Sequence, residues 1–145
     1  MDLTHDYPRS AKDKMAGIDS LARMTDKARA AAQGKLGEYH YDCPHDKPVL
    51  AFLGVDAATF KQKAATSSDA DVETWVRDTY LKGKSPAEIA AFNEDRENWR
   101  PDPGSQSAAY FDETRQAVAP DRPEIKTWFD LLDLDEKRPV ARAHA

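Results

Sequence analysis

Apolar residues recur at helical spacing along most of the chain. The first such group consists of Ile18, Leu21, Ala22, Ala28 and Ala32. Because these positions repeat near the period of one helical turn, they predict a helix over about 19–33. Asp19 is expected to cap this helix at its start and Gly34 to end it, since these residue types favour the two ends of helices.

Three further helices are predicted from acidic residues that precede apolar runs. Asp46 and Asp56 each stand at the start of a short run, where a carboxylate can accept hydrogen bonds from free backbone N–H groups. The third run follows Asp69 and Asp71 and forms one apolar stripe, made of Val72, Trp75, Val76 and Tyr80.

Capping motifs and prolines divide the second half of the chain. The segment Ser85–Glu88 is a capping box that predicts a helix ending before Pro101. Another helix is expected to stop at Pro120. The segment Asp121–Glu124 matches a second capping box, which predicts a last helix whose apolar stripe is Ile125, Trp128, Phe129 and Leu132.

These patterns together predict an all-α fold, because no run of alternating polar and apolar residues is long enough for a sheet. We expect a single compact domain of about six or seven short helices over residues 18–135. An extended N-terminal arm is predicted over 1–17, an irregular polar loop after the first helix, and a disordered tail over 136–145.

Composition and charge exclude several classes of protein. A length of 145 residues suits one domain, and no apolar run approaches the roughly 20 residues that span a bilayer, so no membrane segment is expected. The net charge is -5, and basic residues alternate with acidic ones, which is not the basic patch of a nucleic-acid-binding protein. The N-terminus lacks a signal or transit peptide pattern, which predicts a cytoplasmic location.

The densest cluster of reactive side chains is the string GEYHYDCPHD that follows the first predicted helix. If this loop is extended, Glu38, His40 and Asp42 share one face, because alternate residues of an extended chain point the same way. An imidazole between two carboxylates suits proton transfer by His40 or ligation of a metal. A local polar network that satisfies the loop backbone is the structural alternative.

Two cations precede this loop on one face of the predicted helix. Arg23 and Lys27 lie at i and i+4 with Asp26 beside them. These cations form either a clamp for a substrate carboxylate or phosphate, or an ordinary surface ladder of ion pairs. Cys43 is a single cysteine with no fixed cation expected nearby, so we interpret it as a small buried apolar residue.

The strings LARMTDKARA and GEYHYDCP, with PRS near the N-terminus, resemble the bacterial domain-of-unknown-function family 5069. The resemblance covers residues 2–80, and the segment over 83–135 is longer than we expect of that family. His45 stands where the family more usually has an aliphatic residue. The resemblance implies no activity, but it places family motif positions at Arg23, Asp26, Lys27, Arg29, Glu38, His40, Tyr41, Cys43 and Asp46.

The leading functional hypothesis is an acid/base enzyme of lyase or isomerase type that acts on a small anionic organic molecule without metal or cofactor. In this hypothesis His40 is the acid or base, and Glu38 or Asp42 orients it. Tyr41 donates a hydrogen bond to a developing oxyanion, while Arg23 and Lys27 bind the substrate.

Two other hypotheses stay open. One is a non-enzymatic binding or interaction module in which the GEYHYDC loop is structural. The other is a metal centre for zinc, manganese or iron, formed by Glu38, His40 and either Asp42 or His45. Neither hypothesis predicts whether the chain forms a homo-oligomer.

Overall fold

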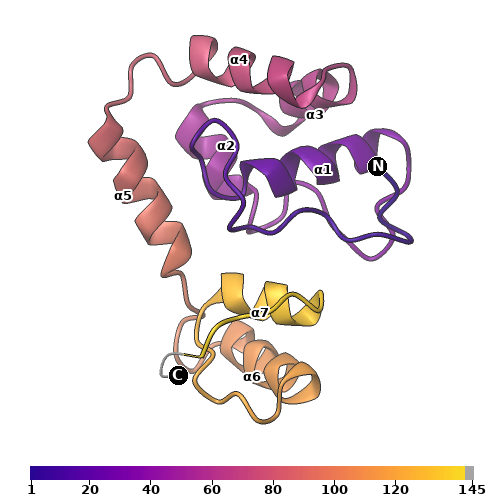
Figure 1. Cartoon of the computed structure of the whole chain (residues 1–145), viewed down its shortest axis with the longest axis vertical. Coiled ribbons are helices and arrows are strands. Elements are labelled where there is room, and N and C mark those ends of the chain that lie inside the picture. Colours follow the sequence, from indigo (N-terminus) through magenta and orange to yellow (C-terminus); the bar gives the residue numbers. More distant parts are fainter. Residues whose placement is uncertain (143–145) are drawn as a thin grey trace. The chain divides into compact units, whose positions relative to one another are not determined.

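The computed structural model describes residues 1–142, which contain seven helices and no strand (Figure 1). The predicted all-α class is therefore confirmed. The last three residues of the predicted tail, including His144, lie outside the described residues. The helices are α1 (Leu21–Ala32), α2 (Lys47–Leu53), α3 (Ala57–Ala65), α4 (Asp69–Thr79), α5 (Pro86–Glu97), α6 (Gln106–Val118) and α7 (Trp128–Asp135).

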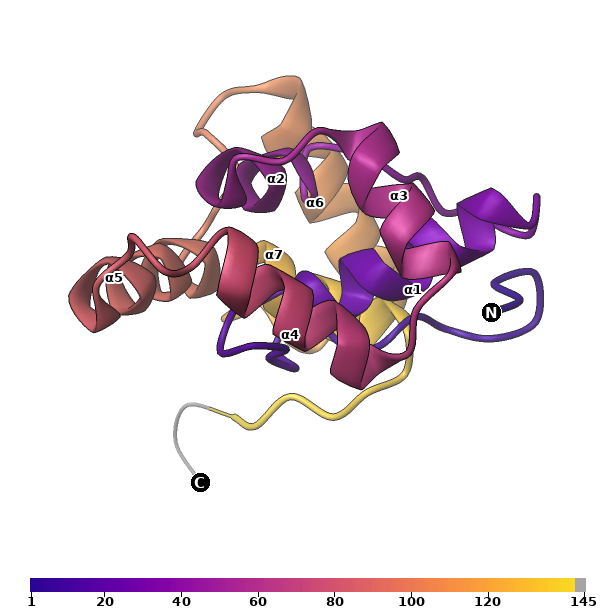
Figure 2. The same ribbon diagram turned by 90° about the horizontal axis from the view of Figure 1, so that it is seen from above.

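Contacts divide the chain into two compact units, one over Met1–Asn93 and one from Glu94 onward. In the first unit α1 packs against α3, and α3 packs against α4 (Figure 2). In the second unit α6 packs against α7, with Phe111, Ile125 and Leu131 as its buried core. The predicted division into an arm, one helical domain and a disordered tail stays a prediction.

The core of the first unit is made of apolar side chains from α1 to α4 and from the segments that precede α1 and α3, with Phe60 as its largest fully buried member. Ile18 and Leu21 are also fully buried, which agrees with the apolar period of the first helix. Burial of these side chains stabilises the unit, since a fully buried leucine or isoleucine contributes about 1.5–3 kcal/mol.

Several predicted helix starts are confirmed by their hydrogen bonds. The Glu88 N–H donates to the Ser85 hydroxyl at 3.1 Å, and the Ser85 N–H donates weakly to the Glu88 carboxylate at 3.5 Å. Asp56 accepts a hydrogen bond from the Thr59 N–H at 2.7 Å and so caps α3. These starts were predictable because a cap depends only on residues within one turn of each other.

The predicted caps of the first and last helices are wrong. The cap position of α1 is Ser20 with φ +68°, because the backbone N–H of Asp19 is bonded to the Asn93 side chain at 2.9 Å and the helix begins one residue later. Asp121 and Glu124 do not open α7, since Glu124 pairs with Arg122 at 2.8 Å. That helix begins at Trp128, and its cap is the hydroxyl of Thr127.

The first residues of the chain lie on α1 and on the loop that follows it. Leu3, Ala11 and Met15 are buried. The Leu3 N–H donates to the Lys35 carbonyl at 2.9 Å. Gly37 has φ +59°, and its Cα lies so close to this segment that an added Cβ would stand 2.9 Å from the Leu3 carbonyl oxygen.

Within residues 1–142, no helix has both the length and the apolar character that crossing a membrane requires.

Candidate functional site

The polar loop over 35–46 is a series of turns and not an extended strand. Gly37 and Asp42 both have positive φ values, +59° and +60°, so the backbone changes direction twice. The simple alternation that would put Glu38, His40 and Asp42 on one face is therefore interrupted. Glu38 and His40 are exposed, and neither side chain makes a hydrogen bond or ion pair with another residue in the described part of the chain.

Asp46 is the residue that organises the loop. Its side chain is 2% exposed, and its Oδ2 accepts a hydrogen bond from the Asp42 N–H at 2.9 Å. The Cys43 N–H points to the same oxygen at 3.5 Å. Asp46 precedes α2 as predicted, but its side chain does not cap that helix, because its oxygens face the loop and α1 instead.

Lys27 of α1 is the charge partner of Asp46. Its Nζ lies 2.9 Å from Oδ1 of Asp46, and the Lys27 side chain is only 3% exposed. The ammonium also donates to Sγ of Cys43 at 3.3 Å. A fixed cation therefore does lie beside Cys43, contrary to the prediction, and the half-buried thiol belongs to a cluster with Lys27 and Asp46.

Tyr41 and Asp42 have partners of their own within the first unit. The Tyr41 hydroxyl donates to the Ala57 carbonyl at 2.7 Å. Burial, together with the carboxylates of Asp46, Asp42 and Asp56, raises the pKa of Tyr41, so the phenol stays protonated. The Asp42 carboxylate pairs with Lys47 at 2.9 Å on the surface.

Arg23 is 4% exposed and contacts the first residues of the chain. Its Nη1 donates to the Arg9 carbonyl at 3.2 Å, and its guanidinium lies 5.6 Å from the centre of the Tyr39 ring. The helix face that carries Arg23 and Lys27 is therefore buried rather than a surface ladder of ion pairs.

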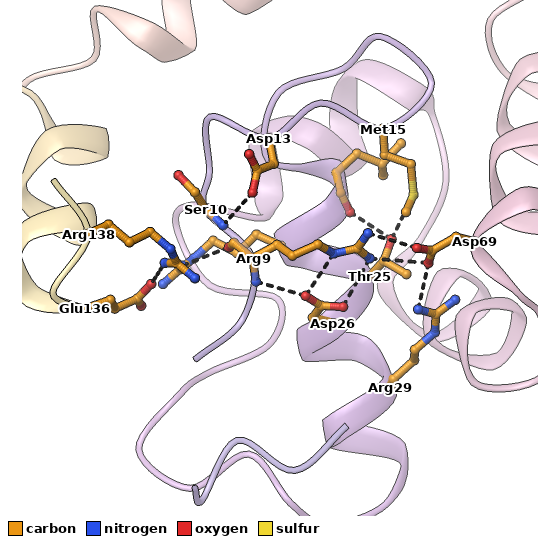
Figure 3. A network of polar contacts seen from close by, with 12 residues as sticks. Arg9, Ser10, Asp13, Met15, Thr25, Asp26, Arg29, Asp69, Glu136 and Arg138 are labelled. Carbon is orange, nitrogen blue, oxygen red and sulfur yellow. Dashed lines mark hydrogen bonds and ion pairs between the residues drawn. The ribbon is translucent and has the colours of Figure 1, made fainter. Parts of the chain in front are cut away.

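A second polar cluster, which the sequence patterns did not predict, is centred on Arg9 (Figure 3). Its guanidinium donates to Asp26 of α1 through Nε and Nη2, both at 3.1 Å, and to Asp69 of α4 through Nη1 at 2.8 Å. Arg29 donates to the other Asp69 oxygen at 2.8 Å. This cluster ties the N-terminal segment to two helices, as Figure 3 shows.

Hydrogen bonds determine the protonation of this second cluster. Desolvation disfavours the charged form of Asp69, but the hydrogen bonds from Arg9 and Arg29 outweigh it and lower the pKa of that carboxyl. Desolvation likewise opposes the charge of Arg9, and the bonds to Asp26 and Asp69 outweigh it and raise its pKa. Both groups are therefore charged near neutral pH.

The fold brings only some of the predicted site residues into contact with one another. Lys27 meets Asp46 and Cys43, whereas Glu38 and His40 point outward without those partners. In residues 1–142 no three His, Cys, Asp or Glu side chains are arranged so that they could hold a metal ion. Glu38, His40 and Asp42 or His45 are therefore not arranged as a ligand set.

The fold and this site define a small all-α protein in which a buried Lys–Asp pair fastens a turn-rich polar loop to the first helix. A family model described as a domain of unknown function, DUF5069, matches residues 5–138, and the chain belongs to this family. The match extends through the segment over 83–135, so the family covers more of the chain than the residues 2–80 that the motifs indicated. A comparison with curated proteins found no match.

Proposed function

We propose that the protein is a non-enzymatic binding or interaction module in which the loop over 35–46 is structural and presents Glu38 and His40 to a partner. The observation that carries this proposal is the buried ion pair between Lys27 and Asp46, at 2.9 Å. Lys27 is the cation that an anionic substrate would need, and it is already paired with Asp46. The same pair fastens the loop to α1. Rigid scaffolds that display exposed polar loop residues are a common arrangement in binding proteins.

The acid/base hypothesis has less support from these contacts. It needs Lys27 and Arg23 to bind a substrate and Tyr41 to donate to an oxyanion. Lys27 is paired with Asp46, Arg23 is buried against the N-terminal segment, and the Tyr41 hydroxyl is bonded to Ala57. An enzyme of lyase or isomerase type would have to exchange these partners for substrate, at a desolvation cost for each group left behind. A binding module can keep all of these hydrogen bonds and ion pairs.

Glu38 and His40 suggest the chemistry of the partner. Both side chains are exposed. A carboxylate and an imidazole that are both exposed suit a partner surface that carries hydrogen-bond donors or cations. We further propose a cytoplasmic location for the protein, since its one cysteine, Cys43, is a free thiol.

Thermal unfolding with a panel of small carboxylates and phosphates distinguishes the two hypotheses. The binding module predicts that no compound in the panel raises the melting temperature, because Lys27 is already paired with Asp46 and Arg23 is already bonded to the Arg9 carbonyl. A compound that stabilises the wild type but not a His40→Ala variant would contradict the proposal and favour the acid/base enzyme.

The partner itself is sought by chemical cross-linking in living cells, followed by mass spectrometry. The matched control is a Glu38→Ala/His40→Ala variant, which is expected to keep the wild-type melting temperature. A partner that is cross-linked by the wild type and lost with the variant supports the proposal. Partners that are the same for both proteins would contradict the role assigned to these two side chains.

A further inference from the structure

Cys43 and Lys27 bring a thiol and an amine into contact inside the first unit. Nζ of Lys27 lies 3.3 Å from Sγ of Cys43, which is within the separation of about 3–3.5 Å that characterises reacting atoms before bond formation. The Lys27 side chain is 3% exposed, so its amine is held in place by the surrounding protein. Cys43 is half-buried and is thus accessible to a small oxidant.

We propose that Cys43 and Lys27 form an oxidative modification site, at which hydrogen peroxide leads to a covalent sulfur–nitrogen bond between the two side chains. This inference is independent of the proposed binding function. It rests on the three-residue cluster, in which the amine and the thiol are adjacent and Asp46 contacts both.

The first step is oxidation of the Cys43 thiolate by peroxide. Sulfur attacks one peroxide oxygen, an S–O bond forms and the O–O bond breaks, and the departing hydroxide takes up the thiol proton to leave as water. The product is a sulfenic acid. A neighbouring cation and partial exposure are the features that favour this reaction at a cysteine, and Cys43 has both.

The second step joins the two residues. Lys27 transfers a proton to Asp46, whose Oδ1 lies 2.9 Å from Nζ, and the neutral amine attacks Sγ. The S–N bond forms and the S–O bond breaks. The departing hydroxyl takes the proton from Asp46 and leaves as water, and the new S–N nitrogen gives its extra proton to the Asp46 carboxylate. Overall, one thiol, one amine and one peroxide give one sulfenamide and two waters. Asp46 therefore both accepts the amine proton and holds Nζ beside Sγ.

Mass spectrometry of the full-length protein tests the proposal. The folded wild type is treated with hydrogen peroxide, digested and searched for the Lys27 and Cys43 peptides joined with the loss of two hydrogen atoms. We expect this linked peptide, and we expect dithiothreitol to separate it. Lys27→Arg is the matched variant, since it keeps a cation for Asp46 but lacks the amine, and the link should then be lost.

The same treatment in urea gives a control that does not depend on a variant. Unfolding separates the two side chains, so the link should not form even though the thiol is then fully accessible. The proposal is overturned if the folded wild type carries an oxidised Cys43 without the link, if Cys43 does not react, or if the link forms equally well in urea.

Discussion

Nζ of Lys27 and Oδ1 of Asp46 lie 2.9 Å apart, with the two side chains only 3% and 2% exposed. An ion pair buried to this extent is costly to disrupt, because removal of one partner leaves an unpaired charge away from water. The pair connects α1 to the residue that precedes α2, and Asp46 at the same time binds the loop backbone. The conformation of the loop therefore depends on a contact between residues far apart in the sequence.

A double-mutant cycle is expected to detect strong coupling between these two side chains. Lys27→Met and Asp46→Leu should each lower the free energy of unfolding by about 3–5 kcal/mol, since each leaves the other charge buried. The double variant should lose less than the sum of the two, by about 1–3 kcal/mol. Urea unfolding monitored by circular dichroism gives the free energy of unfolding of the wild type, the two single variants and the double variant. Strict additivity would mean that the two side chains do not interact in solution.

Acid is expected to reduce the contribution of Asp69 to the stability of the folded protein. The hydrogen bonds from Arg9 and Arg29 lower the pKa of Asp69 below its ordinary value of 3.8 in the folded protein. A lowered pKa means that the stabilisation is fully present above the pKa of the unfolded chain and is lost as the pH falls through that of the folded protein.

The difference in melting temperature between the wild type and Asp69→Asn measures this contribution. The wild type should melt higher at pH 7, and the difference should shrink once the pH is well below 3.8. Glu73→Gln is the control on the same helix, because Glu73 forms a partly exposed i,i+4 pair with Arg77 at the surface. A difference for Asp69→Asn that is constant with pH would contradict the assigned ion pairs.

Gly37→Ala is expected to destabilise the protein more than Gly34→Ala does. Both glycines have positive φ values, +59° and +67°, so each substitution costs about 1–2 kcal/mol of backbone strain. At Gly37 the new Cβ would also lie 2.9 Å from the Leu3 carbonyl oxygen, whereas at Gly34 no atom lies within 4 Å. Urea unfolding compares the two variants, and equal losses would show that the N-terminal segment does not pack against Gly37.

Most of the helices could be predicted from the sequence because their signals are local. The capping box at Ser85–Glu88 and the cap at Asp56 involve residues within one turn, and both formed as expected. The prediction failed at Asp19, whose backbone N–H donates to the side chain of the distant Asn93. The cap position is therefore Ser20, and the helix begins at Leu21. A local pattern contains no information about such a partner.

The candidate site was less predictable for the same physical reason. The patterns selected Lys27, Asp46 and Cys43 as family motif positions, but not their mutual contacts, which depend on how the loop folds back on α1. Arg9 was missed entirely, because it lies in a segment without helical periodicity and gains its role only by reaching Asp26 and Asp69. The string PRS in the family motif was the only signal at that position.

The structural role of the loop is tested most sharply by two substitutions within it. Asp46→Asn keeps the shape of the side chain but removes the charge that balances Lys27, and it should lower the free energy of unfolding by about 3 kcal/mol or more. His40→Ala removes an exposed side chain without a partner in the described structure, and it should change that value by no more than about 0.5 kcal/mol. A large loss for His40→Ala with little change for Asp46→Asn would contradict the structural role of the loop proposed above.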